Sequence, residues 1–297
     1  MPHILTLVAA PGALDPALVS RCRAALTALG ATPGAPDWLA EAEAVDLPFE
    51  NAPAELAAAA ARTALEGAPV DAIASPAEGR RKKLLVADMD STIVTSETLD
   101  EIAAYAGLKD QIAAITARSM NGELDFAQAL HARVAMLAGL SVDALEATWA
   151  TTEMMPGAAT LVATMRADGA VCCLASGGFT FFTGRVAQKL GFDHHVSNTL
   201  LIEGGKLTGK VAEPVFDRNA KLATLTRLAT ENGLPMAATL AVGDGANDLD
   251  MIGAAGLGVA YRAKPIVAAA ARARVDHTDL LALLYAQGFR RTEFRTG

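Results

Sequence analysis

The sequence predicts an α/β protein with a Rossmann-like parallel-sheet core, a helical cap inserted after the first core strand, and a small N-terminal α+β domain. Three observations lead to this prediction. Apolar runs of the kind found in buried parallel strands end in polar residues at three places in the chain. The long segment between the first two runs shows helical spacing of its apolar residues. Residues 1–80 alternate short strand and helix patterns.

The N-terminal domain is expected to span residues 1–80. The patterns predict a strand over 4–9, a helix over 16–29 with Asp15 as its N-cap, a helix over 53–65 and a strand over 70–74, and they leave 38–47 ambiguous. The basic run 80–83, in a polar segment over 76–83, is interpreted as a solvated linker. The second domain is therefore expected to span 81–297.

The first apolar run, residues 84–87, leads directly into two acids one residue apart, Asp88 and Asp90. Side chains at positions i and i+2 of an extended segment point the same way, so both acids should face one crevice at the carboxyl end of the strand. Ligands bind at that edge of open α/β sheets. Like charges gathered there repel one another unless a cation or a chemical task holds them together, and a Mg²⁺ ion meets both conditions.

The segment over about 96–168 is expected to form the cap, with helices over 100–106, 110–120, 125–137 and 142–149. The core would then comprise 81–95 and 169–297. Its second strand, over 170–179, ends in Ser176, Gly177 and Gly178. Glycines let backbone N–H groups approach an anion closely, so this strand end suits a phosphate group.

The third apolar run, over 239–243, ends in an acidic turn that contains Asp244, Asn247 and Asp248 and offers further oxygen ligands. Before it, a helix is predicted over 180–190 and a β-hairpin over 196–202 and 206–211. Lys221, near the start of a further helix, is a candidate for the fixed positive charge that a phosphoryl group needs.

Composition excludes several classes of protein. The chain has 297 residues, 52% of them hydrophobic, which supports a substantial core. No run approaches the ~18 apolar residues of a membrane span, and the first residues lack a secretory pattern, so a cytoplasmic protein is expected. A net charge of −8 argues against nucleic acid as a partner. Cys22, Cys172 and Cys173 offer no disulfide framework.

From about residue 80 onward, the acid pair, the Ser-Gly-Gly turn, Lys221 and the acidic turn resemble, in order, the four motifs of the haloacid dehalogenase superfamily of aspartate-dependent phosphohydrolases. With Glu97, Phe126 and Arg133, the set resembles the phosphoserine phosphatase family. The resemblance implies a hydrolase core that converts O-phospho-L-serine to L-serine and phosphate, the last step of serine biosynthesis.

The resemblance also implies the site. Asp88 would be the nucleophile and Asp90 the general acid and base. Mg²⁺ would be held by Asp88, Asp244 and the main-chain carbonyl of Asp90. The remaining residues would bind substrate: the phosphoryl group through Ser176, Gly177, Lys221 and Asn247, and the amino-acid part through Glu97, Arg133 and Phe126.

Several alternatives stay open at this point. The enzyme could be a phosphatase or phosphotransferase for another small phosphate ester, or the chain could be an amino-acid-sensing regulatory protein. The N-terminal domain is compatible with an amino-acid-binding domain of the ACT type, which the phosphoserine phosphatase resemblance suggests. A structural or dimerising role, with a homodimer as the assembly, is an equal alternative.

Overall fold

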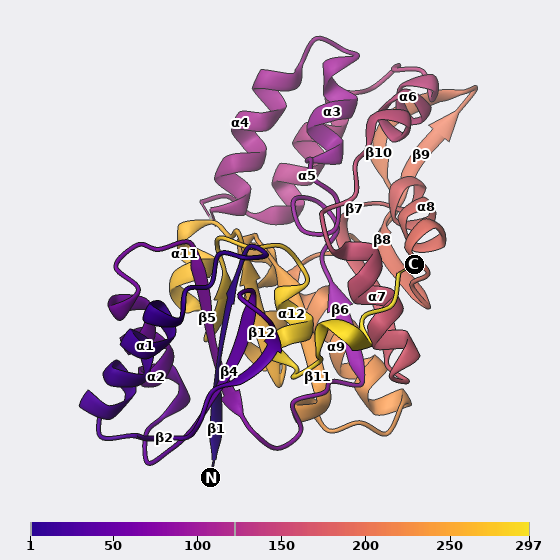
Figure 1. Ribbon diagram of the computed structural model, residues 1–297. Coiled ribbons are helices and arrows are strands. Elements are labelled where there is room, and N and C mark those ends of the chain that lie inside the picture. The colour runs from indigo at the N-terminus through magenta and orange to yellow at the C-terminus, as the bar shows by residue number, and fades with distance from the viewer. Residues whose placement is uncertain (1, 122, 297) are drawn as a thin grey trace.

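The computed structural model describes residues 2–121 and 123–296, and its centre is a six-stranded sheet. The strands follow the order β13-β12-β11-β6-β7-β8, and every neighbouring pair is parallel. β6 therefore lies between β11 and β7 (Figure 1). The bounds are β6 Leu84–Ala87, β7 Val171–Phe179, β8 His194–Asn198, β11 Thr239–Gly243, β12 Leu257–Tyr261 and β13 Ala273–Val275. The predicted α/β class with a parallel core is confirmed.

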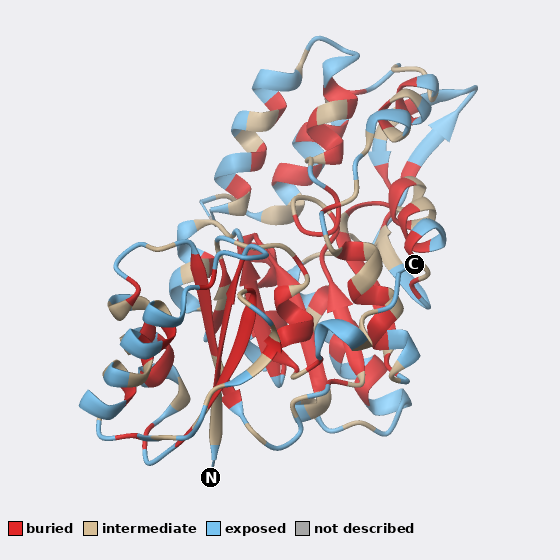
Figure 2. Cartoon of the chain, viewed as in Figure 1, coloured by how far each residue is buried: buried red, intermediate tan, exposed pale blue. Residues whose placement is uncertain are grey.

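Helices cover both faces of this sheet because successive residues of each strand point to opposite sides. Leu85 and Cys172 belong to the apolar cluster that includes α7 (Ala158–Ala167), α8 (Thr180–Leu190) and α12 (Ala282–Ala286). Leu84 and Cys173 belong to a second cluster with α9 (Arg218–Glu231) and α10 (Leu249–Ala254). The strands β6, β11 and β12 are accordingly buried along their length, whereas the edge strand β8 begins with exposed residues (Figure 2). The cysteines serve as small apolar side chains.

α7 lies within the predicted cap range of 96–168 but packs on the core sheet. The helical segment between β6 and α7 lies over the carboxyl edge of the sheet, as predicted for a cap (Figure 1). It contains α3 (Thr98–Ala104), α4 (Lys109–Met120), α5 (Phe126–Ala135) and α6 (Asp143–Thr151). A hairpin of β9 (Leu200–Glu203) and β10 (Lys206–Val211) packs beside α5, and the N–H of Gly139 donates to the carbonyl of Leu207 at 2.8 Å. The prediction of one hairpin arm over 196–202 is wrong, because 196–198 belong to β8 of the core sheet.

The N-terminal part is an antiparallel sheet in the order β2-β4-β1-β5, with β3 also paired to β4. The bounds are β1 His3–Ala9, β2 Thr32–Pro33, β3 Asp37–Ala40, β4 Ala44–Glu50 and β5 Val70–Pro76. Helices α1 (Pro16–Ala28) and α2 (Ala54–Ala64) share an apolar cluster with one face of this sheet. Asp15 caps α1 as predicted, accepting from the N–H of Ala17 at 2.7 Å. The ambiguous segment 38–47 forms parts of two strands.

The basic run at 80–83 is not a solvated linker, and that prediction is wrong. Arg80 donates to the carboxylate of Asp46, with one Nη2–Oδ1 distance of 3.0 Å, and to the carbonyls of Tyr285 and Ala286. Lys82 is 8% exposed, and its Nζ donates to carbonyl oxygens of Gly79 and Ala237 at 2.8 Å each. These cations lie where the N-terminal sheet meets the core, so acceptors from both parts replace water.

The other face of the N-terminal sheet packs on the core. Val8 and Ile73 share one apolar cluster with Leu283 and Tyr285 of the α12 segment. The two parts share packed side chains, so the domain boundary at residue 80 stays a prediction. No helix within the described residues is long and apolar enough to cross a membrane.

Candidate active site

Three neighbouring strands bring the predicted residues to one edge of the core sheet. Asp88 and Asp90 follow β6, Ser176 and Gly177 lie near the end of β7, and Asp244 follows β11. A cavity opens between this edge and the cap. The predicted residues that line it are Asp88, Asp90, Glu97, Phe126, Arg133, Ser176, Gly177, Asp244 and Asn247. The sequence thus identified the residues of one cavity, although they come from segments far apart in the chain.

Lys221 lies beneath this cavity, buried between two carboxylates. Its Nζ is 2.7 Å from Asp88 and 2.6 Å from Asp248, and the residue is 1% exposed. Burial alone would lower the pKa of Lys221, but the carboxylates of Asp248 and Asp88 raise it above its usual value. Lys221 therefore stays charged. Its second partner, Asp248, was not predicted as a site residue, although its place in the acidic turn was a signal for it.

The acids at the floor of the cavity carry more negative charge than Lys221 can neutralise. Oxygens of Asp88, Asp244 and Asp248 lie within 4.8 Å of one another. Burial and the neighbouring charge of Asp248 raise the pKa of Asp88 to about 7, against the opposing effect of Lys221. Burial and the charge of Asp88 raise the pKa of Asp244 well above its usual value. Clustered, buried carboxylate oxygens of this kind suit a hard divalent cation.

The share of each acid in such a cation site follows from its existing contacts. Both oxygens of Asp248 are already used, one by Lys221 and the other by the N–H of Gly245 at 3.1 Å. Within the described residues, the one hydrogen bond to the Asp244 side chain is long, 3.4 Å from Thr92 Oγ1, and Lys264 Nζ lies 4.0 Å away. Asp244, and the oxygen of Asp88 that Lys221 does not contact, are therefore better placed than Asp248 to bind a cation.

Asp90 is held in a different way from Asp88. Its Oδ1 accepts the N–H of Thr98 at 3.0 Å, and a Cβ placed on Gly178 would lie 2.8 Å from its Oδ2. Burial raises the pKa of Asp90 well above its usual value, and the charges of Glu97 and Asp88 act in the same direction. The carboxyl therefore holds a proton more readily than an ordinary aspartate, which suits a general acid.

Polar groups of the β7 turn and the acidic turn complete the core side. The N–H of Gly178 donates to Ser176 Oγ at 2.9 Å and fixes that hydroxyl. The Oδ1 of Asn247 is buried and has no hydrogen-bond partner within the described structure. Buried polar atoms are seldom left unpaired, so this oxygen is available to a ligand.

The cap contributes one anion and one cation. Glu97, the N-cap residue of α3, accepts from Ser91 Oγ at 2.8 Å, and Arg133 of α5 is 3% exposed. Among the described residues, no ion pair joins Glu97 to Arg133.

The sequence analysis did not identify the apolar cavity residues Leu99, Met120 and Leu130. Helical spacing of apolar residues does not distinguish the wall of a cavity from the protein core.

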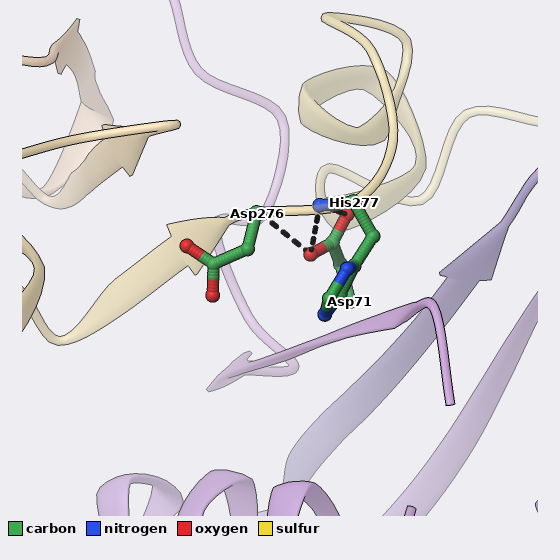
Figure 3. Close-up of side chains that lie close together, drawn as sticks. All are labelled: Asp71, Asp276 and His277. Atoms are coloured by element: carbon green, nitrogen blue, oxygen red, sulfur yellow. Dashed lines mark hydrogen bonds between the residues drawn. The ribbon is translucent and has the colours of Figure 1, made fainter. Parts of the chain in front are cut away.

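A second group of acids, outside this cavity, has a structural role. Asp71 of β5 lies beside Asp276 and His277, which follow β13 (Figure 3). The carboxylate of Asp71 accepts the N–H of Asp276 at 2.7 Å, the N–H of Thr278 at 2.9 Å and the hydroxyl of Thr278 at 2.6 Å. Because these donors occupy its oxygens, Asp71 holds a loop in place and has no capacity left for a metal ion.

The haloacid dehalogenase-like hydrolase family matches residues 85–253. This range contains both acids of the first strand end and the whole acidic turn. The chain belongs to this family of hydrolases. Phosphatases of the family generally use a divalent metal, which agrees with the acids described above.

Relatives of this chain at 39–46% identity are phosphoserine phosphatases. The chain is 43% identical to that of Streptomyces coelicolor over 82% of its own length, and 40% identical to that of Lactococcus lactis over 68%. It covers 59% of the first relative and 94% of the second. It thus spans a little over half the length of the first relative.

Solved structures of phosphoserine phosphatases are also similar to this chain. A substrate-bound phosphoserine phosphatase complex superposes with a TM-score of 0.67 at 38% identity, covering 69% of this chain and 97% of that one. An unliganded probable phosphoserine phosphatase from Vibrio cholerae superposes with a TM-score of 0.78 at 33% identity, covering 98% of this chain and 88% of that one. The second match includes the N-terminal part.

Proposed function

We propose that this protein hydrolyses O-phospho-L-serine to L-serine and phosphate and so completes serine biosynthesis. The observation that carries the proposal is the division of one cavity into two ends. Asp88, Asp90 and Ser176 line its core side, while Glu97 and Arg133 line its cap side. A phosphate ester of an amino acid has the matching parts.

The chemistry at the core side begins with the Asp88 carboxylate. One oxygen attacks phosphorus in line with the leaving serine oxygen, giving an aspartyl-phosphate. Asp90 donates its proton to that leaving oxygen and then removes a proton from the water that hydrolyses the intermediate. Lys221 stays paired with the Asp88 side chain and keeps positive charge beside the phosphoryl group.

The cation we propose for this site is Mg²⁺, held by Asp88, Asp244 and the main-chain carbonyl of Asp90. When bound, it supplies charge neutralisation for the phosphoryl oxygens. The hydroxyl of Ser176, the N–H of Gly177 and the Nδ2 amide hydrogens of Asn247 donate to the same oxygens from the protein side.

Recognition of the serine part is assigned to the cap. The Glu97 carboxylate pairs with the substrate ammonium, and the Arg133 guanidinium forms two parallel hydrogen bonds with the substrate carboxylate. Phe126 closes the cavity over the phosphate, since its ring tip would lie 2.6 Å from a Cβ placed on Gly177. The ring excludes water from the reacting group.

The test is release of inorganic phosphate from a panel of phosphorylated metabolites with and without Mg²⁺. We expect a metal-dependent preference for L-phosphoserine, and we expect Asp88→Asn to lose at least about a thousandfold in turnover because the nucleophile is removed. Preference for another ester would keep the mechanism and refute the substrate. Phosphate transfer to an added alcohol such as homoserine would favour a phosphotransferase, and an inactive wild-type protein would favour the sensing alternative.

A further inference from the structure

The guanidinium of Arg133 is fixed by two hydrogen bonds that leave one side of it free. Its Nε donates to the carbonyl of Ala129 at 3.1 Å, and its Nη1 donates to Thr116 Oγ1 at 2.9 Å. A guanidinium has five N–H donors, so both hydrogens of Nη2 and one of Nη1 remain. Within the described structure, these have no recorded acceptor. They form the pair of nitrogens that a carboxylate engages.

Thr116 does not end this chain of contacts. Its hydroxyl accepts from Arg133 and lies 2.7 Å from Asp100 Oδ1, to which it donates. Thr116 is 3% exposed and Asp100 is 8% exposed. The three residues come from the three cap helices α4, α3 and α5, so a buried hydroxyl and a buried carboxylate bridge them.

The contacts from Arg133 through Thr116 to Asp100 give the buried Arg133 guanidinium a nearby negative charge. Arg133 is buried near the acids Asp100, Glu97 and Asp90. A buried guanidinium without a fixed counter-charge would be drawn to Glu97, and the two groups would then neutralise each other in place of a ligand. Asp100 supplies a counter-charge that is tied to Arg133 through the hydroxyl of Thr116, which lies between the two charged groups.

We propose that Thr116 and Asp100 are positioning residues, which aim the free side of Arg133 at the substrate carboxylate and keep Arg133 apart from Glu97. This inference rests on the proposed function, because it concerns the carboxylate of phosphoserine. Neither residue lines the cavity. They act on the substrate only through Arg133.

The test compares Thr116→Val, which removes the hydroxyl at equal size, with Thr116→Ser, which keeps it. We measure kcat and KM for L-phosphoserine and for O-phosphoethanolamine, which lacks the carboxylate. Loss of a hydrogen bond to a charged group should raise the KM of Thr116→Val for L-phosphoserine about tenfold or more. Its kcat/KM for O-phosphoethanolamine should stay within about threefold of the wild-type value, and Thr116→Ser should resemble the wild type on both substrates.

Asp100→Asn provides a second measurement that does not depend on the folding of Thr116→Val. It keeps an acceptor for the Thr116 hydroxyl but removes the counter-charge, so the same selective rise in KM is expected. Equal losses on both substrates, or an unchanged KM for L-phosphoserine, would overturn the positioning role while leaving the proposed function intact. A wild-type enzyme that does not prefer L-phosphoserine to O-phosphoethanolamine would refute the proposed function, and this inference with it.

Discussion

Lys221 shows at the scale of single residues how a buried charge is maintained. One ammonium holds two carboxylates, Asp88 and Asp248, and all three groups are buried. Transfer of such ions from water is costly, and the arrangement is stable only because each charge has a partner. Removing the ammonium would leave two like charges together in the protein interior.

We therefore expect Lys221→Met to lower the free energy of unfolding by about 3–5 kcal/mol, measured by urea denaturation with EDTA present. Without Lys221, the Asp88 carboxyl must bind a proton to stay buried beside Asp248, so its folded-state pKa rises further above its unfolded value. Stability is then lost as pH rises, and the deficit should be larger at about pH 8 than at about pH 5. The exposed Lys206→Met serves as the control, and an equal effect of both variants would contradict this account.

Some residue roles could be predicted and others could not. Asp88 and Asp90 were found because local spacing at a strand end carries the signal. The Asp100–Thr116–Arg133 bridge was not found, because its members belong to three helices and each is an ordinary polar residue of its own helix. The pairing of Arg80 with Asp46 was missed for the same reason, since a basic run gives no sign of an acid 34 residues earlier.

The contact of α10 with β12 illustrates packing at the scale of elements. Gly258 of β12 lies so close to α10 that an added Cβ would be 1.8 Å from the carbonyl oxygen of Ile252. The neighbouring atom is backbone, so it cannot move away as a flexible side chain would. A Cβ added to Gly253, within α10, would meet no atom of the described structure within 4 Å outside its own stretch of helix.

The two glycines should consequently respond to alanine in opposite directions. Gly258→Ala is expected to lower the free energy of unfolding by about 1–3 kcal/mol or more through overpacking. Gly253→Ala is expected to raise it by up to about 1 kcal/mol, because alanine favours the helix. Denaturant unfolding of the two variants beside the wild type decides the matter, and a stabilising Gly258→Ala would show that α10 can shift.

Element boundaries were harder to predict than element types. The pattern over 196–202 is continuous, yet the strand breaks after Asn198. The amide of this buried side chain donates to the carbonyl of Gly177 at 2.8 Å, and its oxygen accepts the N–H of Phe216 at 2.7 Å. These contacts with distant segments end β8 at Asn198, and the chain then continues toward the cap. A local sequence pattern cannot indicate such contacts.

At the scale of the whole molecule, the N-terminal sheet and the core behave as one packed body. They share an apolar cluster, the bonds of Arg80 to Asp46 and to Ala286, and the loop held by Asp71. The type of each part could be predicted from sequence, but their docking could not, because its contacts join residues near opposite ends of the chain.

We expect scanning calorimetry to show one unfolding transition for this body, since separating the two parts would leave Asp46 and Asp71 without their donors. Asp71→Ala should lower the midpoint temperature, because three N–H groups and a hydroxyl lose their acceptor, and should leave the KM for L-phosphoserine unchanged. Two separated transitions in the wild-type protein would show that the parts unfold independently. The exposed Asp15→Ala is the control for loss of a local cap alone.

The position of β6 in the sheet has a consequence for biosynthesis. Its two partners, β7 and β11, are encoded after the cap, so the ribosome delivers the central strand long before either neighbour. Until then both edges of an apolar strand lack hydrogen-bond partners, and such edges promote aggregation. The nascent chain should depend on shielding by a chaperone or by its own cap helices, and the floor of the cavity should assemble only after Asp244 has been translated.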